Sequence, residues 1–310
     1  MVKILVCDRI DPEGIEKLRE AGFDVKFLTR REKLKEEIRE CDVLIVRSRT
    51  KVTRDLIERG RCLKLIARAG SGLDNIDLKA AEERGIAVVN APEAPADSVA
   101  ELTIGLMIAL ARKITFADAS MKRGEWLKKE LRGFLLKNKK LGLIGLGNIG
   151  LRVARIAKAM GMKILVTKRT PPSPQLLEEL GADFLSLDEL LRQSDIISLH
   201  VPLTEETKHM IDVEEISKMK NGVFLINTAR GEVINEEALL DALKTGKIGG
   251  AALDVYGTEP PKNLELIKHP NVICTPHIGA QTVEAQKEAS LIIADKIIRF
   301  FNSQAHNSPK

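Results

Sequence analysis

The chain has 310 residues, of which 44% are hydrophobic and 30% charged, a balance typical of a folded globular protein and not of a disordered one. The formal charge of +5 is spread along the sequence and only 3% of the residues are aromatic, which disfavours binding to nucleic acid. No apolar run reaches the roughly 18 residues of a membrane span, the amino terminus lacks a signal-peptide pattern, and the four cysteines form no C-x-x-C pair, so we expect a cytoplasmic protein without a membrane partner or a metal site.

The first part of the chain alternates short apolar runs with helical patterns. Strands are expected at residues 2–6, 25–28, 43–46, 63–67 and 86–89, and helices at residues 12–21, 32–40 and 78–84. This alternation predicts a parallel sheet flanked by helices, because consecutive parallel strands need a crossover connection. The first part of the chain is therefore expected to form one α/β domain.

A segment rich in Pro and Ala, residues 90–97, precedes a long helix that is expected to begin at Asp97 or Ser98 and to end near Ile114. The helix is apolar nearly all round for about four turns, which predicts a buried helix joining two domains. Residues 122–136 are basic and irregular and contain the only tryptophan, Trp126, so we expect this segment at the surface.

A second series of strands and helices begins near residue 141. Strands are expected at residues 141–144, 163–167, 196–201, 223–227, 250–255 and 272–275, with helices at residues 175–180, 187–193, 213–219 and 236–245. A last amphipathic helix, residues 282–301, is expected to return to the first domain. Ligands of such sheets bind beyond the carboxyl ends of the strands, so the polar residues that follow the strands are the candidates for function.

The turn after the strand at residues 141–144 contains Gly145, Gly147 and Gly150 in the pattern G-x-G-x-x-G. The first glycine permits a tight turn, the second lets a pyrophosphate approach the backbone, and the third lets the next helix pack closely. Free N–H groups at the start of that helix favour phosphate. Because the pattern stands between a strand and an amphipathic helix, it predicts dinucleotide binding; an ordinary glycine-rich turn is the structural alternative.

Three polar residues stand at or beyond strand ends in the second series: Arg230, Glu259 and His277. Each has an ordinary structural explanation when taken alone: Arg230 could form a surface ion pair, Glu259 could be a charge in a loop, and His277 could neighbour a helix cap. Together they meet the needs of hydride transfer between a nicotinamide and a carbon that bears a hydroxyl group. His277 can take the hydroxyl proton, Glu259 can hold the imidazole and raise its pKa, and Arg230 can bind a carboxylate in bidentate fashion.

Five motifs occur in this order along the second series of strands and helices: G-L-G-N-I-G, N-T-A-R-G, A-A-L-D-V, E-P-P and T-P-H-I-G-A. In the order and spacing of these motifs, and over residues 2–301, the chain resembles the NAD-dependent D-isomer-specific 2-hydroxyacid dehydrogenases. The resemblance implies two doubly wound parallel-sheet α/β domains, a Rossmann cofactor domain (residues 98–282) inserted in a flavodoxin-like substrate-binding domain (residues 1–97 and 283–310). It also implies that Arg230 binds the substrate acid, Glu259 supports the histidine and His277 transfers the proton.

The same resemblance implies the cofactor contacts. Asp254 is expected near the nicotinamide. The other expected contacts are Gly145, Gly147, Asn148, Ile149, Gly150, His200, Val201, Pro202, Thr207, Thr228, Ala229, Arg230, His277 and Gly279.

Within the family, residues 45–53 and 66–77 resemble the D-3-phosphoglycerate dehydrogenases more than the lactate or glycerate dehydrogenases. Consecutive N–H groups in the second segment can bind a carboxylate, and arginines at strand ends could reach a phosphate, although solvated charge explains the arginines equally well. The candidate substrate-binding residues are Arg47, Ser48, Arg68, Gly70, Ser71 and Gly72. We expect oxidation of 3-phospho-D-glycerate to 3-phosphohydroxypyruvate, the entry to serine biosynthesis.

Two alternatives remain open. A glyoxylate or hydroxypyruvate reductase of the same fold would make little use of Arg47 and Arg68. A non-catalytic nucleotide-sensing protein is the other, and the intact trio of Arg230, Glu259 and His277 speaks against it. The sequence ends at residue 310 without the regulatory domains of longer phosphoglycerate dehydrogenases, so no serine feedback is expected, and the resemblance implies a homodimer paired through the cofactor domain.

One position departs from the fingerprint. An acidic residue is expected at the end of the second strand of the cofactor domain, where it bonds the adenosine ribose. Lys168 and Arg169 stand there instead and would attract a ribose 2′-phosphate. NAD is therefore the expected cofactor by resemblance, and NADP is expected to be accepted as well.

Overall fold

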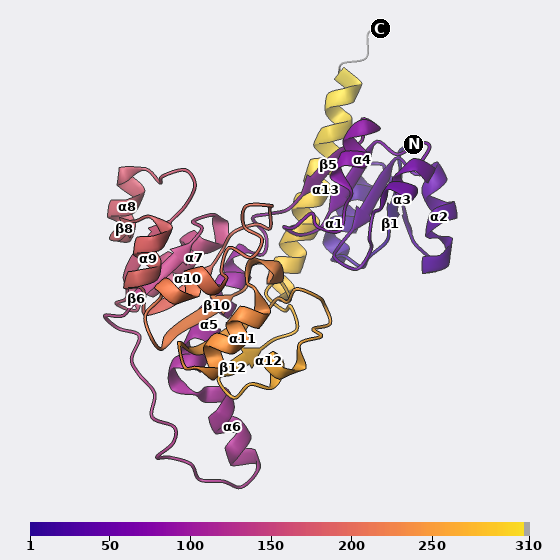
Figure 1. The fold of residues 1–310 in the computed structure, drawn as a ribbon. Helices are drawn as coiled ribbons and strands as arrows, with labels where there is room; N and C mark the ends of the chain where they lie inside the picture. Colours follow the sequence, from indigo (N-terminus) through magenta and orange to yellow (C-terminus); the bar gives the residue numbers. More distant parts are fainter. Residues whose placement is uncertain (307–310) are drawn as a thin grey trace. The chain divides into compact units, whose positions relative to one another are not determined.

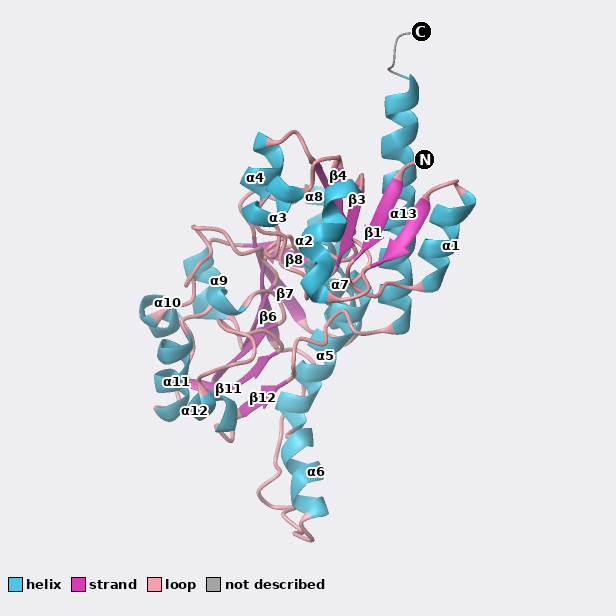
Figure 2. Cartoon of the chain, turned by 90° about the vertical axis from the view of Figure 1, so that its right-hand side faces the viewer, coloured by secondary structure: helices cyan, strands magenta, loops and turns pink. Residues whose placement is uncertain are grey.

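The computed structural model describes residues 1–306, with side chains through residue 303. The chain forms two compact units: residues 1–96 with the chain from residue 280 onward, and residues 97–279. Each unit contains one parallel sheet with helices packed against it (Figures 1 and 2). In the described part of the chain, no helix is long and apolar enough to cross a membrane.

The first unit has a five-stranded parallel sheet in the order β2-β1-β3-β4-β5. Its strands are β1 (Lys3–Val6), β2 (Asp24–Phe27), β3 (Val43–Val46), β4 (Leu65–Arg68) and β5 (Ala87–Asn90). Its helices are α1 (Pro12–Glu20), α2 (Leu34–Glu37), α3 (Arg54–Arg59), α4 (Leu78–Glu83) and α13 (Val283–His306). Every residue of the central strand β3 is buried, as a parallel sheet covered on both faces requires.

The last helix, α13, packs along α1 in this unit. Asp295 of α13 forms an ion pair with Lys17 at 2.7 Å, and Ser290 Oγ donates a hydrogen bond to the carbonyl of Asp11 at 2.9 Å. Buried Ile293 and Ile297 place the apolar face of α13 in the core of the unit. Residues 280–303 therefore complete a core whose strands come from the start of the chain.

The prediction of a single helix at residues 32–40 is wrong. The segment instead forms a 3-10 turn (Arg31–Lys33), the short helix α2 and a second 3-10 turn (Ile38–Glu40). Among residues 31–40 only Ile38 is buried, and most of the other side chains are charged, so little apolar surface stabilises one continuous helix.

The second unit has a seven-stranded parallel sheet in the order β12-β11-β10-β9-β6-β7-β8. Its strands are β6 (Lys140–Ile144), β7 (Lys163–Thr167), β8 (Ala182–Phe184), β9 (Ile196–Leu199), β10 (Val223–Asn227), β11 (Ile248–Leu253) and β12 (Val272–Cys274). Its helices are α5 (Ala96–Arg112), α6 (Ile114–Lys122), α7 (Asn148–Ala159), α8 (Pro174–Leu180), α9 (Leu187–Gln193), α10 (Val213–Lys218), α11 (Glu236–Lys244) and α12 (Leu264–Lys268), with a 3-10 turn at Gly231–Val233. The two expected parallel-sheet α/β domains are thus confirmed.

The apolar helix that was expected to end near Ile114 ends two residues earlier, at Arg112. Lys113 has the left-handed backbone conformation, φ 52°, and its Nζ donates a hydrogen bond to the carbonyl of Glu130 at 3.0 Å. A left-handed residue breaks the helical ladder, so a separate helix, α6, begins at Ile114. Figures 1 and 2 show α6 and the following segment extending away from the sheet of their unit. Three short elements, α3, β8 and α12, were not expected because three to six residues show no clear periodicity.

The sheet order explains where a ligand of the second unit binds. β6 lies between β9 and β7, so the strand order reverses beside the first strand of this sheet. All strands are parallel, and the loops that follow β6, β7 and β9 therefore lie at one edge of the sheet. The loops that follow β10, β11 and β12 continue along the same edge.

Candidate active site

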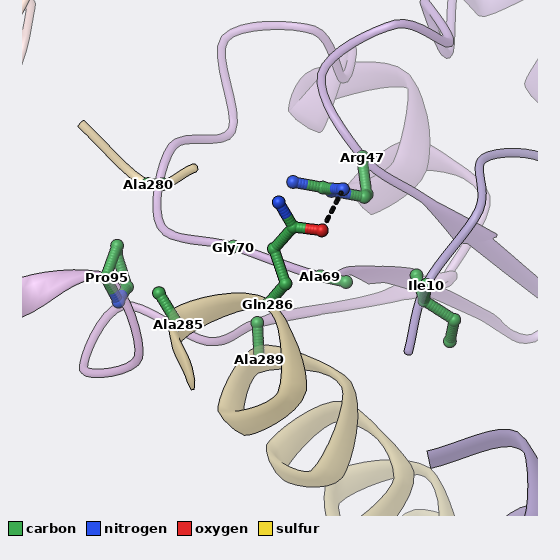
Figure 3. A pocket seen from close by; sticks show the side chains of 9 residues that line it. All are labelled: Ile10, Arg47, Ala69, Gly70, Pro95, Ala280, Ala285, Gln286 and Ala289. Atoms are coloured by element: carbon green, nitrogen blue, oxygen red, sulfur yellow. Dashed lines mark hydrogen bonds between the residues drawn. The ribbon is translucent and has the colours of Figure 1, made fainter. Parts of the chain in front are cut away.

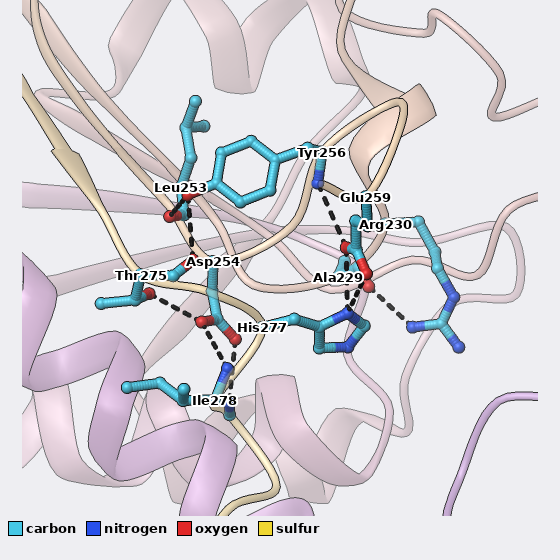
Figure 4. A network of polar contacts seen from close by, with 10 residues as sticks. Ala229, Arg230, Leu253, Asp254, Tyr256, Glu259, Thr275, His277 and Ile278 are labelled. Carbon is cyan, nitrogen blue, oxygen red and sulfur yellow. Dashed lines mark hydrogen bonds and ion pairs between the residues drawn. The ribbon is translucent and has the colours of Figure 1, made fainter. Parts of the chain in front are cut away.

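Arg230, Glu259 and His277 follow three neighbouring strands of the second unit. Arg230 comes after β10, Glu259 after β11 and His277 after β12. Figure 4 shows the three side chains beside one another, with His277 and Glu259 facing each other. The sheet order thus brings together residues that are separated by 18 to 47 positions in the chain.

His277 and Glu259 form a direct side-chain contact. Nδ1 of His277 lies 2.8 Å from Oε2 and 2.9 Å from Oε1 of Glu259. The hydrogen bond to Glu259 raises the pKa of His277, against the effect of partial burial. Burial by itself raises the pKa of Glu259, but the hydrogen bond and charge of His277 outweigh it, so the pKa of Glu259 is lowered. With Nδ1 held by Glu259, Nε2 is the ring nitrogen that remains for a substrate proton.

Asp254 holds the loop that carries His277. Its carboxylate is buried, with 1% of the residue exposed. Oδ1 accepts hydrogen bonds from Thr275 Oγ1 at 2.6 Å and from the N–H of Ile278 at 2.8 Å, and Oδ2 accepts one from the N–H of Gly279 at 2.8 Å. His277 itself has φ 54°, a left-handed conformation that the contacts on either side hold in place.

Arg230 is fixed by the turn after β10. Its Nη1 donates to the carbonyl of Ala229 at 2.7 Å, and the side chain of Asn227 donates to the carbonyl of Arg230 at 2.8 Å. The positive charge of Arg230 lowers the pKa of both His277 and Glu259, which places it close enough to act on the pair. The guanidinium therefore lies within electrostatic range of the imidazole, where it can bind the carboxylate of an acid.

Tyr256 supports the same site and was not predicted. Its Oη lies 3.0 Å from the carbonyl of Leu253 and 2.9 Å from that of Thr275, and so links the loops after β11 and β12. Its backbone N–H donates to Oε1 of Glu259 at 3.4 Å. The signal that could have found it is the only tyrosine of the chain, standing just after a strand.

The glycine turn shows a different constraint at each glycine. Gly145 has φ 97°, and a Cβ there would lie 2.4 Å from the carbonyl oxygen of His200. A Cβ at Gly150 would lie 2.4 Å from the carbonyl oxygen of Gly145, so the helix approaches the strand too closely for any side chain. A Cβ at Gly147 would meet no described atom within 4 Å. Contacts within the chain therefore do not require a glycine at 147, whereas close approach of a pyrophosphate does.

The helix after this turn begins at Asn148 without a side-chain cap, so the N–H groups of its first turn, Asn148 and Ile149 included, are available to a phosphate.

His200 lies next to the glycine turn. Its Nε2 lies 3.0 Å from Ser198 Oγ, while Nδ1 is buried without a hydrogen-bond partner among the described residues. Burial lowers the pKa of His200 to about 4, so the ring is neutral. An open glycine and an unpaired buried nitrogen both fit a site that receives a dinucleotide.

The remaining expected cofactor residues fall on the same edge. Val201, Pro202 and Thr207 follow β9, and Thr207 Oγ1 donates to the carbonyl of Pro202 at 2.6 Å. Thr228 and Ala229 lie between β10 and Arg230, and Thr228 Oγ1 lies 2.9 Å from Thr103 Oγ1 on α5. Lys168 and Arg169 are exposed at the end of β7, where Arg169 forms an ion pair with Glu206.

The expected substrate-binding residues all lie in the first unit. Arg47 follows β3, and buried Asp8 accepts hydrogen bonds from its N–H at 2.7 Å and from the Thr50 hydroxyl at 3.0 Å, so the loop that also carries Ser48 has a fixed shape. Nη1 of Arg47 donates to Gln286 Oε1 at 3.3 Å at the rim of an open hollow (Figure 3).

Gly70 lines the same hollow as Arg47, and its backbone lies directly against the Arg68 side chain. A Cβ at residue 70 would lie 2.2 Å from Nη1 of Arg68, so the glycine makes room for that guanidinium. The N–H groups of Ser71 and Gly72 donate to no acceptor within the part of the chain that the structure describes. Both arginines and a pair of N–H groups therefore gather around one turn.

Comparison with known proteins identifies this arrangement. Residues 104–279 match the model of the D-isomer specific 2-hydroxyacid dehydrogenase NAD binding domain. The chain belongs to this family. The prediction from the sequence that the chain is a member of this family is thereby confirmed. The second unit contains the family's NAD binding domain.

Three related proteins show how far the likeness extends. The chain is 51% identical to a D-3-phosphoglycerate dehydrogenase of Methanocaldococcus jannaschii over 96% of this chain and 57% of that protein. It is 52% identical to a hydroxypyruvate reductase of Thermotoga maritima over 96% of this chain and 97% of that protein. The solved structure of D-lactate dehydrogenase from Aquifex aeolicus, complexed with NAD and lactic acid, superposes with a TM-score of 0.87 at 34% identity, covering 98% of this chain and 96% of that one. The chain thus spans little more than half the length of the first relative and nearly all of the second.

Proposed function

We propose that the chain transfers a hydride between a nicotinamide dinucleotide and a D-2-hydroxy acid. The observation that carries this proposal is the His277–Glu259 pair beside Arg230, on the sheet edge that also bears the glycine turn. Nε2 of His277 takes the hydroxyl proton, Glu259 stabilises the imidazolium that results, and Arg230 binds the carboxylate of the acid. When bound, the nicotinamide supplies the acceptor or donor of the hydride.

The proposed substrate is 3-phospho-D-glycerate, whose oxidation gives 3-phosphohydroxypyruvate for serine biosynthesis. Arg47 and Arg68 supply the positive charge that a phosphate needs, and the N–H groups of Ser71 and Gly72 supply further donors. The likeness to a D-3-phosphoglycerate dehydrogenase supports this choice. The likeness to a hydroxypyruvate reductase over nearly the whole of both chains favours the second candidate, a reductase of small unphosphorylated keto acids.

A substrate panel separates the two candidates. Initial rates are measured with 3-phosphohydroxypyruvate, hydroxypyruvate and glyoxylate, for the unmodified chain and for Arg47→Ala and Arg68→Ala. Arg49→Ala is the matched control, because Arg49 is an exposed arginine in the same loop as Arg47. If the chain is a phosphoglycerate dehydrogenase, both test variants should lose activity with 3-phosphohydroxypyruvate but not with the other two acids. Equal rates with all three acids, unchanged in the variants, favour the reductase. No turnover with any acid would leave only a binding role.

Lys168 and Arg169 support use of NADP beside NAD. Both are exposed cations at the end of β7, where the family fingerprint has an acidic residue. A guanidinium and an ammonium there favour a ribose 2′-phosphate over a hydroxyl group. Initial rates with both dinucleotides test the proposal, and a strong preference for NAD would refute it.

We also propose a homodimer formed through the second unit. α6 and the segment after it extend from the sheet (Figure 1) and expose several large apolar side chains: Ile114, Phe116, Met121, Trp126 and Leu135. Trp126 is 76% exposed, and such a concentration of exposed apolar surface is typical of an interface. Light scattering of Met121→Glu tests this, with Val213→Glu as a control at an exposed apolar residue of α10. A dimer that survives Met121→Glu would place the interface elsewhere.

A further inference from the structure

An ion pair joins the two loops that flank the glycine turn. Arg169, in the loop after β7, pairs with Glu206, in the loop after β9. β6 lies between these two strands, and the glycine turn follows β6 at the same edge of the sheet. The pair therefore spans the position at which the fold receives a dinucleotide.

The loop that carries Glu206 is anchored on both sides. On one side, Thr207 Oγ1 donates to the carbonyl of Pro202 at 2.6 Å and accepts from the N–H of Thr204 at 2.8 Å. On the other side, Lys208 pairs with Glu232 at 3.3 Å, and the N–H of His209 donates to the carbonyl of Glu232 at 2.7 Å. The backbone around residue 206 is thus held by contacts that do not involve the Glu206 side chain.

The charge of Glu206 opposes the charge that the end of β7 presents to a ligand. Of the two cations at that position, Arg169 is better suited than Lys168 to bind a phosphate. The Arg169 guanidinium is already paired with Glu206. Lys168 forms no ion pair with any residue that the structure describes. A carboxylate is also the group that accepts hydrogen bonds from the ribose hydroxyls of NAD, and it repels the 2′-phosphate of NADP.

We propose that Glu206 supplies, from the loop after β9, the acidic group that the end of β7 lacks, and that it limits the binding of NADP by competing for Arg169. Glu206 is then the residue that sets the dinucleotide preference. This inference rests on the proposal that Lys168 and Arg169 face the adenosine ribose.

The pair is weak enough for a ligand to displace it. The Arg169 and Glu206 side chains are 75% and 71% exposed, and exposed ion pairs contribute only about 0–1 kcal/mol. A 2′-phosphate can therefore exchange with Glu206, at the expense of leaving that carboxylate beside a second anion. Removal of the carboxylate abolishes both the competition and the repulsion.

Binding measurements test the inference without reference to turnover. Calorimetry gives the dissociation constants of NADH, NADPH and 2′,5′-ADP for the full chain, for Glu206→Gln and for Glu205→Gln. Glu205 is the matched control, because it is exposed on the same loop and has no ion pair in the described part of the chain. We expect Glu206→Gln to bind NADPH and 2′,5′-ADP about five-fold tighter or more, without tighter binding of NADH. Glu205→Gln is expected to match the unmodified chain.

Two further variants separate this inference from the cofactor assignment on which it rests. In the Arg169→Gln background, Glu206→Gln is expected to lose its effect, because the competition no longer exists. If Arg169→Gln weakens 2′,5′-ADP binding but Glu206→Gln changes nothing, the role of Glu206 is wrong while the assignment of Arg169 stands. An equal gain from Glu205→Gln would also overturn the inference, since the effect would then be one of net charge.

Discussion

Nδ1 of His277 lies 2.8 Å from Oε2 of Glu259, and the two side chains come from loops after neighbouring strands. This contact fixes the orientation of the ring and leaves Nε2 for the substrate. It also raises the pKa of His277, because the carboxylate stabilises the imidazolium. A proton-transfer group whose charged form is stabilised in this way is suited to both directions of a dehydrogenase reaction.

Glu259→Gln should shift the pH dependence of the reaction downward. The neutral amide no longer stabilises the imidazolium, so the pKa of His277 falls from its raised value. Reduction of a keto acid needs protonated His277, and its rate should therefore decline at a lower pH than in the unmodified enzyme. Profiles of kcat/KM against pH measure this, and an unchanged alkaline limb would show that Glu259 does not control the titrating group.

Asp254→Asn should destabilise the loop that carries His277. The buried carboxylate accepts three hydrogen bonds, and an amide has only one oxygen to replace two. We expect a loss of about 1–3 kcal/mol in the free energy of unfolding, with a lower kcat. Urea denaturation measures the loss, and Thr275→Val is the control that removes only the hydroxyl contact. Equal stability of the two variants would contradict the positioning role of Asp254.

Gly147→Ala should weaken NADH binding, whereas Gly150→Ala should reduce the stability of the fold. A Cβ at residue 147 meets no described atom within 4 Å, so the variant should keep its stability but bind NADH roughly tenfold more weakly, about 1.4 kcal/mol. A Cβ at residue 150 would lie 2.4 Å from a backbone oxygen, so that variant should lose about 1–3 kcal/mol of stability. Thermal denaturation and NADH titration distinguish them. Unchanged NADH affinity in Gly147→Ala would place the pyrophosphate elsewhere.

Arg230→Lys should impair binding of the acid much more than binding of the dinucleotide. Lysine keeps the positive charge but lacks the planar fork that binds a carboxylate at two points. We expect kcat/KM for the keto acid to fall roughly 100-fold, about 2.7 kcal/mol, with a much smaller change in the dissociation constant of NADH. Steady-state kinetics and NADH titration measure the two quantities. A parallel loss of NADH affinity would mean that Arg230 serves the cofactor instead.

The sequence was informative where function depends on strand order and uninformative where it depends on contacts between loops. The ends of β10, β11 and β12 could be predicted, and with them Arg230, Glu259 and His277, because parallel strands end at one edge. The roles of Asp254 and Tyr256 in holding the histidine loop could not, since they depend on hydrogen bonds across two strands.

The same distinction explains two further differences. The basic pair after β7 was visible in the sequence, but Glu206, which is 37 residues away and pairs with Arg169, was not. The break between α5 and α6 was missed because Lys113 is an ordinary helix former, and its left-handed conformation accompanies a contact with Glu130 in a distant loop. In both cases tertiary contacts decide what local pattern cannot.

His277→Gln tests the central claim most directly. The variant removes the proton-transfer group, so kcat should fall by about 10²–10⁴-fold, far more than the dissociation constant of NADH changes, and the melting temperature should stay close to that of the unmodified enzyme. His269→Gln, at the end of α12, serves as the control and should keep full activity. Turnover of His277→Gln close to that of the unmodified enzyme would contradict the account, because the proton would then be transferred by another group.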